Sequence, residues 1–258
     1  MDYDTLLTNE ERGVATVTLN RPDVMNALNK QMRAELTYAL QDLASRARVL
    51  VLTGAGRAFC SGQDLGDGGN AAQIDLERTL REEYEPMLRA IYDAPVPVIA
   101  AVNGSAAGAG ANLALAADIV IAAESASFIQ AFTRIGLIPD AGGTWFLPRQ
   151  IGFARAMGSM LFAERISAKQ AADWGMIWET IPDAQFAAQW QARATSLATG
   201  PTLAYRNIRK ALRKSLSNPL DAQLALEAQL QAEVGKTRDF QEGVMAFLEK
   251  RPAAFEGR

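Results

Sequence analysis

Apolar side chains recur every three or four residues in one segment near the N-terminus: Leu28, Met32, Leu36, Leu40 and Leu43. This spacing places them on one face of a helix, so the pattern predicts an amphipathic helix over residues 29–44. Upstream, residues 5–9 and Val14–Leu19 flank Glu11-Arg12-Gly13. Polar and apolar residues alternate in the second of these segments, which predicts a β-hairpin.

Continuous apolar runs occupy residues 49–52, Val98–Val102 and Ile119–Ala123. Runs of this length and composition predict strands that are covered on both faces. Residues 75–92 predict a second long helix between the first two runs. This alternation of strands and helices indicates an α/β core.

From residue 152 onward the pattern becomes helical. Asn218-Pro219 predicts a helix that begins with an asparagine cap and ends at Val234, because proline is favoured at the first helical position. A last helix is predicted over residues 239–250. Five cations at helical spacing precede these elements: Arg206, Arg209, Lys210, Arg213 and Lys214. We expect their shared face to be a solvated surface, with attraction of phosphate as the alternative.

The composition suits one large soluble domain, since 49% of the 258 residues are hydrophobic and 21% are charged. A formal charge of −3 argues against nucleic acid as the main partner, because phosphate binding needs clustered cations. No segment has the pattern of a secretory signal or a membrane span, so we expect a cytoplasmic protein without a membrane partner. One cysteine excludes an internal disulfide, and the absence of histidine leaves few soft metal ligands.

Asp140 stands between Pro139 and Gly142-Gly143, in a loop suited to presenting a side chain to a pocket. Without histidine a Ser-His-Asp triad is excluded, and proton transfer near pH 7 falls to Asp, Glu, Tyr, Lys, Cys60 or water. Cys60 has no base to activate it, so we interpret it as a buried structural thiol. The loop alone leaves two roles open for Asp140, the cap of a helix over residues 141–149 or a catalytic carboxylate.

Residues 58–65 and 104–112 each follow a predicted strand and contain a glycine turn. If the two loops lie side by side, one backbone N–H from each would form an oxyanion hole. The simpler interpretations are a turn for the first loop and close helix–strand packing for the second. Gly108-Ala109-Gly110 also matches part of a dinucleotide fingerprint, but Leu113 occupies the third glycine position, which argues against such a site.

Motifs along the whole chain resemble, in order, those of the crotonase, or enoyl-CoA hydratase/isomerase, superfamily. They are Leu19-Asn20-Arg21-Pro22 with Asn26-Ala27-Leu28-Asn29, Leu52-Thr53-Gly54-Ala55-Gly56, Phe59-Cys60-Ser61-Gly62-Gln63-Asp64-Leu65, Ala101-Val102-Asn103-Gly104 with Ala107-Gly108-Ala109-Gly110, Pro139 with Gly142-Gly143-Thr144, and Phe247-Leu248-Glu249-Lys250-Arg251. The resemblance implies an α/β fold, with a crotonase-type spiral of ββα turns over residues 1–200 and a C-terminal helical trimerisation region over residues 201–258. It also implies a homotrimer or homohexamer, with other crotonase-family subunits as candidate partners.

The resemblance further implies an acyl-CoA substrate. Since CoA is part of that substrate, neither a separate cofactor nor a metal is expected. Carried over by position, the backbone N–H groups of Gln63 and Ala109 would form the oxyanion hole. Other substrate or CoA contacts would come from Ala27, Ser61, Gly62, Asp64, Leu65, Gly110, Phe132, Trp145, Phe247 and Lys250. Phe132 and Trp145 would line a dry pocket, whereas Phe247 and Lys250 would reach CoA from a neighbouring subunit.

Hydratases of this superfamily use two glutamates, at positions that hold Asn112 and Phe132 here. Neither side chain transfers protons, so Asp140 is the carboxylate left at a family catalytic position. This pattern is similar to the ring-epoxide isomerases of aerobic phenylacetate breakdown, in which one aspartate serves as acid and base. Further likeness lies in Gly143-Thr144-Trp145 with Leu147-Pro148-Arg149 and in Trp174-Gly175-Met176-Ile177-Trp178. The likeness implies conversion of 2-(1,2-epoxy-1,2-dihydrophenyl)acetyl-CoA to oxepin-CoA.

Three alternatives stay open. The first is a Δ3,Δ2-enoyl-CoA isomerase or hydratase-family enzyme that acts on other acyl-CoAs. The second is a crotonase-fold protein that binds acyl-CoA without catalysis. The aryl-CoA dehalogenase branch also places an aspartate in this loop, as a nucleophile, but its members use a histidine that this chain lacks.

Overall fold

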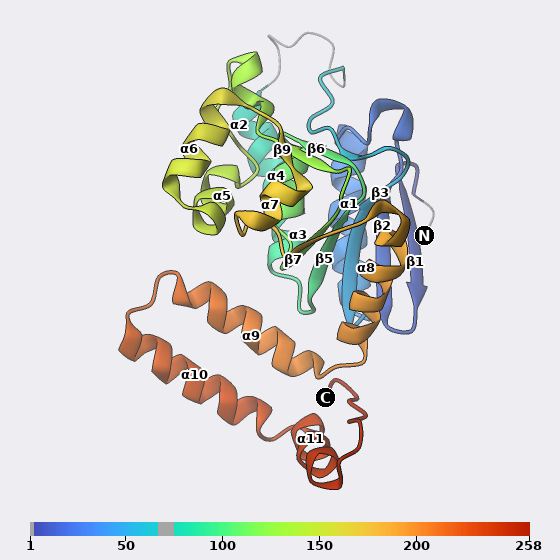
Figure 1. The fold of residues 1–258 in the computed structure, drawn as a ribbon, viewed down its shortest axis with the longest axis vertical. Coiled ribbons are helices and arrows are strands. Elements are labelled where there is room, and N and C mark those ends of the chain that lie inside the picture. The colour runs from blue at the N-terminus through green and yellow to red at the C-terminus, as the bar shows by residue number, and fades with distance from the viewer. Residues whose placement is uncertain (1–2, 67–74) are drawn as a thin grey trace.

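The computed structural model describes residues 3–66 and 75–258, which form two β-sheets and the helices around them (Figure 1). The larger sheet has the order β1-β2-β3-β5-β7-β10, and the smaller sheet has the order β4-β6-β8-β9. The larger sheet contains β1 (Leu6–Glu11), β2 (Val14–Leu19), β3 (Val49–Gly54), β5 (Val98–Val102), β7 (Ile119–Ala123) and β10 (Glu179–Ile181). The smaller sheet contains β4 (Ala58–Cys60), β6 (Ser105–Ala107), β8 (Ser127–Ile129) and β9 (Ile166–Ser167).

Successive turns of the chain stack as a spiral. Strands β3, β5 and β7 pair in parallel in the larger sheet. Strands β4, β6 and β8, which follow them in sequence, pair in parallel in the smaller sheet. Each turn therefore supplies one strand to each sheet, and helices α2 (Leu76–Thr79), α3 (Glu85–Tyr92) and α4 (Ala109–Leu115) connect the turns. The expected α/β spiral of ββα turns is confirmed.

Two glycines mark the points where the chain crosses from the larger sheet to the smaller one. Gly54 ends β3, and Gly104 lies between β5 and β6. A Cβ on Gly54 would collide with the carbonyl oxygen of Ala58, and one on Gly104 with the carbonyl oxygen of Arg57. The two crossings need glycine because backbone approaches backbone there.

The hairpin and the first helix agree with the sequence pattern. β1 and β2 pair antiparallel, with Leu6 opposite Leu19. Helix α1 (Lys30–Ala44) begins after Asn29, whose side chain accepts a hydrogen bond from the Met32 backbone N–H at 2.9 Å. Its apolar face is fully buried against the larger sheet and α3, which stabilises a helix that would be marginal alone.

The second helical pattern, residues 75–92, is continuous but not uniform. Asp75 caps α2, and its side chain accepts from the Arg78 backbone N–H at 3.0 Å. A π-helical turn over Leu80–Tyr84 then joins α2 to α3. The periodicity predicts the helix but not this wider turn.

The later helices are α5 (Gly143–Ile151), α6 (Phe153–Phe162), α7 (Ala168–Asp173), α8 (Asp183–Ala198), α9 (Thr202–Ser215), α10 (Leu220–Val234) and α11 (Arg238–Glu249). In Figure 1 the last three lie together at one end of the molecule, below the sheets. Their role in trimerisation stays a prediction. Within residues 3–66 and 75–258, no helix combines the length and the apolar character that a membrane span requires.

Two helix starts differ from the sequence expectation. Pro219, not Asn218, is the N-cap of α10, and the Asn218 side-chain amide donates to the Gln223 side chain at 3.1 Å. Helix α4 begins at Ala109, within residues 104–112, which the sequence pattern indicated to be a loop with a glycine turn. The first residues of α4 are small, so the helix can pack closely against its neighbours. Because they include glycine and polar residues, the sequence pattern did not indicate that they are helical.

The basic face of α9 is not the solvated surface that we expected. Arg209 and Arg213 both pair with Asp118, at 2.7 Å and 2.8 Å. Their guanidinium groups also donate to the backbone carbonyls of Tyr92 and Ala94, at the end of α3. The expectation was wrong for these two arginines because unpaired carbonyls at a helix C-terminus attract cations, which no local pattern in α9 reveals.

We expect Asp118→Asn to lower the free energy of unfolding by about 3 kcal/mol, because two largely buried guanidinium groups would lose their counter-charge. Urea unfolding followed by circular dichroism measures this change. Asp173→Asn is the matched control, since Asp173 pairs with Lys169 on the exposed surface, where about 0–1 kcal/mol is expected. Equal effects of the two substitutions would contradict a stabilising role for the Asp118 ion pairs with Arg209 and Arg213.

Candidate functional site

Asp140 lies in the loop that leads into α5, and its surroundings test one of its two possible roles, that of a helix cap. Gly142, not Asp140, is the N-cap of α5, and the cap makes no side-chain hydrogen bond. The Asp140 carbonyl oxygen instead accepts from the Gly143 backbone N–H at 2.8 Å. The carboxylate atom Oδ1 is buried and has no hydrogen-bond partner among the described residues. The capping interpretation is therefore wrong.

A buried amide fixes the backbone of this loop. The Asn112 side chain donates to the Asp140 carbonyl oxygen at 2.8 Å and accepts from the Gln130 side chain at 2.8 Å. A Cβ on Gly143 would collide with Asn112, so glycine is required for this approach. Asn112 therefore supports the backbone of the Asp140 loop.

Burial raises the pKa of Asp140 to about 6, and its own backbone N–H opposes the shift by favouring the charged form. A carboxyl group with such a pKa holds and releases a proton close to neutral pH. Carboxyl groups whose pKa is shifted in this way are found more often at functional sites than elsewhere.

Asp140 faces a pocket of about 670 Å³ whose other lining residues are mostly apolar or aromatic. The lining comes from two segments, α2–α3 and the loop that continues into α5: Leu76, Leu80, Tyr84, Glu85, Leu88, Arg89, Tyr92, Leu137, Ile138, Pro139, Ala141, Gly142, Trp145 and Phe146. The Trp145 ring packs edge-on against Tyr92 and Phe146, with centroid distances of 5.7 Å and 5.0 Å. A flat aromatic ring would pack well against such a wall.

Trp145 lines this pocket as expected, but Phe132 does not. Phe132 is buried beside the glycine turn before α4, where a Cβ on Gly108 would lie 3.8 Å from its ring. The 3-10 helix Ala131–Ile135 places Phe132 at that turn, and its contact with the substrate stays a prediction.

The two loops proposed to carry the oxyanion hole do lie side by side. A Cβ on Gly62 would come within 2.8 Å of the Ala107 carbonyl oxygen and 3.4 Å of the Ala109 backbone nitrogen. Gly62 and Gly108 have φ angles of +95° and +52°, conformations that favour glycine. The sharp turns that adjoin Gln63 and Ala109 are therefore specified by their preceding glycines.

Both proposed donors keep their backbone N–H groups unpaired within the described part of the chain. Leu28 bonds to Gly62 and Asp64 on either side of Gln63, at 2.8 Å and 3.2 Å, which turns the Gln63 N–H away from Leu28. Ala109 is the first residue of α4, where N–H groups lack helical partners. Convergence of these two N–H groups on one oxygen atom stays a prediction.

Gly110 and Cys60 pack against each other. A Cβ on Gly110 would collide with the Cys60 carbonyl oxygen, so close packing accounts for this glycine. Burial raises the pKa of the Cys60 thiol to about 12 and keeps it protonated. The interpretation of Cys60 as a buried thiol is confirmed.

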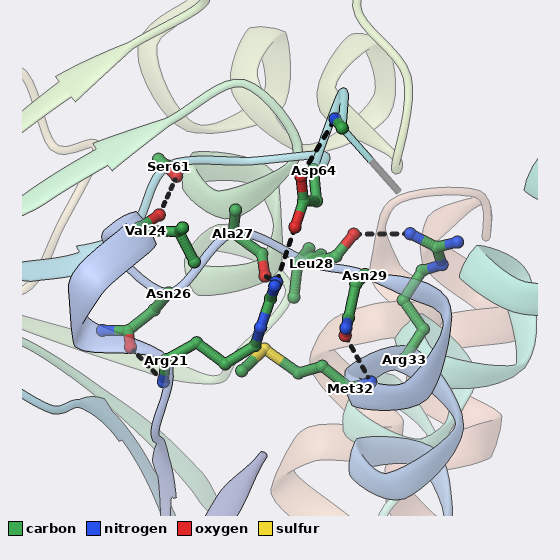
Figure 2. Close-up of polar contacts among 11 residues, drawn as sticks. Arg21, Val24, Asn26, Ala27, Leu28, Asn29, Met32, Arg33, Ser61 and Asp64 are labelled. Atoms are coloured by element: carbon green, nitrogen blue, oxygen red, sulfur yellow. Dashed lines mark hydrogen bonds and ion pairs between the residues drawn. The ribbon is translucent and has the colours of Figure 1, made fainter. Parts of the chain in front are cut away.

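The other predicted CoA contacts lie where the loop before α1 meets the loop after β4 (Figure 2). The Arg21 guanidinium donates to the Ala27 carbonyl oxygen at 2.6 Å and to Asp64 at 2.8 Å, and Ser61 donates to the Val24 carbonyl oxygen at 3.2 Å. Arg21 also holds the pKa of Asp64 below its usual range. Asp64 thus joins the two loops, while Leu65 beside it is exposed. Binding of CoA along these loops stays a prediction.

Phe247 and Lys250 are not brought to Asp140 within one chain. Both lie at the end of α11, which Figure 1 places at the opposite end of the molecule from α4 and α5. Phe247 is 83% exposed. Their contact with CoA stays a prediction that requires a neighbouring subunit.

Sequence reasoning did not single out Tyr84 or Gln130. Tyr84 belongs to a long helical pattern in which an aromatic residue is ordinary, and Gln130 precedes the 3-10 helix without a local motif. Each depends on a segment that is distant in sequence. Only the assembled fold brings Tyr84 into the pocket lining with Asp140, and Gln130 into a hydrogen bond with Asn112.

The spiral, the unpaired amides and the carboxylate pocket define a protein of the same class as the solved enoyl-CoA hydratases and isomerases. A structure from Streptomyces coelicolor titled putative enoyl-CoA hydratase has a TM-score of 0.93 at 39% identity, over 100% of this chain and 96% of that one. The chain belongs to the enoyl-CoA hydratase/isomerase family, whose model matches residues 9–258. It is therefore an enzyme of a family that acts on CoA thioesters.

Two curated relatives cover nearly the whole chain but have different names. A probable enoyl-CoA hydratase from Rhodobacter capsulatus is 64% identical over 100% of both chains. The 1,2-epoxyphenylacetyl-CoA isomerase of Escherichia coli is 48% identical over 98% of both chains. A third, the trans-2-decenoyl-[acyl-carrier-protein] isomerase of Streptococcus mutans, is 34% identical over 100% of both.

Proposed function

We propose that the protein is an isomerase that moves a proton along the acyl group of a CoA thioester, with Asp140 as the single acid and base. The observation that carries this proposal is the unpaired, buried Oδ1 of Asp140 in the wall of an apolar pocket. Partial burial favours the neutral form of such a carboxylate, so it accepts a proton readily.

The two amides supply the other half of the chemistry. The N–H groups of Gln63 and Ala109 hold the thioester oxygen, so that loss of the α-proton to Asp140 leaves an enolate whose charge they stabilise. Asp140 then returns the proton to another carbon of the conjugated system. One base is sufficient when both carbons present the same face to it.

The proposed substrate is 2-(1,2-epoxy-1,2-dihydrophenyl)acetyl-CoA and the product is oxepin-CoA. The aromatic wall of Tyr92, Trp145 and Phe146 and the likeness to the E. coli isomerase support this choice. The name of the R. capsulatus relative favours hydration instead. Hydration requires a second group to activate water, and the second carboxylate in the pocket lining, Glu85, is 58% exposed and lies 3.9 Å from Arg89.

Three assays with the purified protein separate these functions. The substrates are the epoxide, an unbranched Δ3-enoyl-CoA and an unbranched trans-2-enoyl-CoA in water. We expect kcat/KM to be highest for the epoxide. A Δ3,Δ2-isomerase of straight chains, the second candidate, would prefer the Δ3-enoyl-CoA, and the name of the S. mutans relative favours that outcome. Fast hydration of the trans-2-enoyl-CoA would refute the single-carboxylate mechanism.

We expect kcat/KM to rise with pH and to reach half of its maximum near pH 6, because the free enzyme must carry Asp140 as a carboxylate. Initial rates between about pH 4.5 and pH 8.5, measured on a stable substrate, test this expectation. A profile that stays flat down to the ordinary pKa of an aspartate would contradict the buried-base assignment.

A further inference from the structure

Tyr84 lines the same pocket as Asp140, and its hydroxyl is buried. The side chain is 1% exposed, and its hydroxyl has no hydrogen-bond partner in the parts of the chain that the structure describes. A buried hydroxyl without a partner costs free energy, and a ligand in the pocket that accepts a hydrogen bond would remove that cost.

The ring of Tyr84 is held in place beside the Arg33 guanidinium. Tyr84 ends the π-helical turn Leu80–Tyr84, and such turns occur frequently at functional sites. The Arg33 guanidinium lies 5.1 Å from the ring centroid. Arg33 is itself fixed by hydrogen bonds to the Leu28 carbonyl oxygen at 2.5 Å and to Glu83 at 2.7 Å. The phenol is therefore pre-positioned for a ligand.

We propose that the Tyr84 hydroxyl donates a hydrogen bond to an oxygen atom on the acyl group of the substrate, which is the ring oxygen of the epoxide. The inference rests on the proposed function and names the residue that recognises the oxygenated ring. An acyl chain of carbon and hydrogen alone offers no such acceptor.

A donor that contacts the ring oxygen in this reaction must keep its proton. The C–C bond shared by the epoxide and the six-membered ring breaks, and its electron pair joins the π system of the seven-membered ring. Asp140 takes the proton from the α-carbon and returns one to the ring carbon γ to the thioester, so substrate and product have the same composition. The ring oxygen keeps both of its C–O bonds. A strong acid would protonate it and open the epoxide to a phenol, whereas burial raises the pKa of Tyr84 and keeps its O–H intact.

The test compares Tyr84→Phe with the wild-type protein on two substrates, the epoxide and an unbranched Δ3-enoyl-CoA. We expect kcat/KM for the epoxide to fall about tenfold, because one hydrogen bond is lost. The rate on the Δ3-enoyl-CoA should not change, although it also depends on Asp140. Tyr38→Phe is the matched control, since Tyr38 is exposed on α1 and the same hydroxyl is removed there.

Other outcomes overturn the proposal in distinguishable ways. An equal fall on both substrates would mean that Tyr84 acts on Asp140 or on the thioester, and a shifted pH profile would identify Asp140. Unchanged rates on both substrates would exclude the contact while leaving the proposed function intact. A wild-type protein that isomerises the Δ3-enoyl-CoA but not the epoxide would refute the proposed function, and the contact with it.

Discussion

Asp140→Asn is expected to lower isomerase turnover at pH 8 by about 10³-fold. The amide occupies the same space as the carboxylate but cannot accept a proton, and general base catalysis typically contributes about 10²–10⁴-fold. The raised pKa of Asp140, about 6, still leaves the group ionised at pH 8 in the wild-type protein. Exchange of the substrate α-proton with deuterated solvent measures the same step without depending on the identity of the product.

The stability of this variant distinguishes lost chemistry from lost structure. The folded pKa of Asp140 is raised from 3.8 to about 6, so the folded state holds the proton more tightly than the unfolded state. The wild-type protein therefore loses stability as pH rises between these two values, and the penalty persists above them. The asparagine variant should be more stable at pH 8 by about 1–2 kcal/mol, since solvent that reaches the carboxylate weakens the penalty.

Below the unfolded pKa the two proteins should unfold at the same denaturant concentration. Asp173→Asn, on the exposed surface, should change neither turnover nor this pH dependence. An Asp140→Asn protein that is folded and turns over substrate at the wild-type rate would remove Asp140 from the mechanism.

Gly62→Ala is expected to lower kcat by about 10²–10³-fold, the loss typical of one oxyanion-hole donor. The new methyl group would lie 2.8 Å from the Ala107 carbonyl oxygen, at a φ of +95°. Relief of this contact requires the loops of Gln63 and Ala109 to separate. Steady-state kinetics should therefore show a larger change in kcat than in KM, because the oxyanion forms only after binding.

A second glycine with a positive φ serves as the control, because its substitution strains the backbone without moving the two proposed oxyanion-hole donors. Gly175 also has a positive φ, +75°, but the nearest atom to an added Cβ is 3.8 Å away. Gly175→Ala should cost about 1 kcal/mol of stability and leave kcat unchanged. A Gly62→Ala protein that is folded and retains the wild-type kcat would show that the two amides do not act together.

Local sequence patterns predicted helices and strands that are specified by nearby residues, such as a helix cap, or by side chains that are completely buried. Helix α1 followed from its apolar spacing and its Asn29 cap, and the runs now seen as β3, β5 and β7 followed from their length and composition. The pattern on α9 failed because Arg209 and Arg213 are neutralised by Asp118, almost one hundred residues away. Charge spacing on one helix does not show what packs against it.

The residues of the candidate site likewise fall into those with a local sequence signal and those defined only by tertiary contacts. The loop around Asp140 was evident from its proline and glycines, but capping and catalysis were equally compatible with it until Gly142 proved to be the cap. The supporting amide of Asn112 and the hydroxyl of Tyr84 had no sequence signal, because each is defined by a contact or a cavity formed by separate turns of the spiral.

The sequence by itself determined the family, the order of most elements and the carboxylate at the centre of the proposed chemistry, since motifs and periodicity are written in the residue types. Only the tertiary structure decided which groups are buried, paired or free. The raised pKa of Asp140, the unpaired N–H groups of Gln63 and Ala109, and the pocket that Tyr84 and Asp140 both line all arise from the stacking of distant segments. Desolvation and backbone geometry are properties of that packing, and no residue carries them alone.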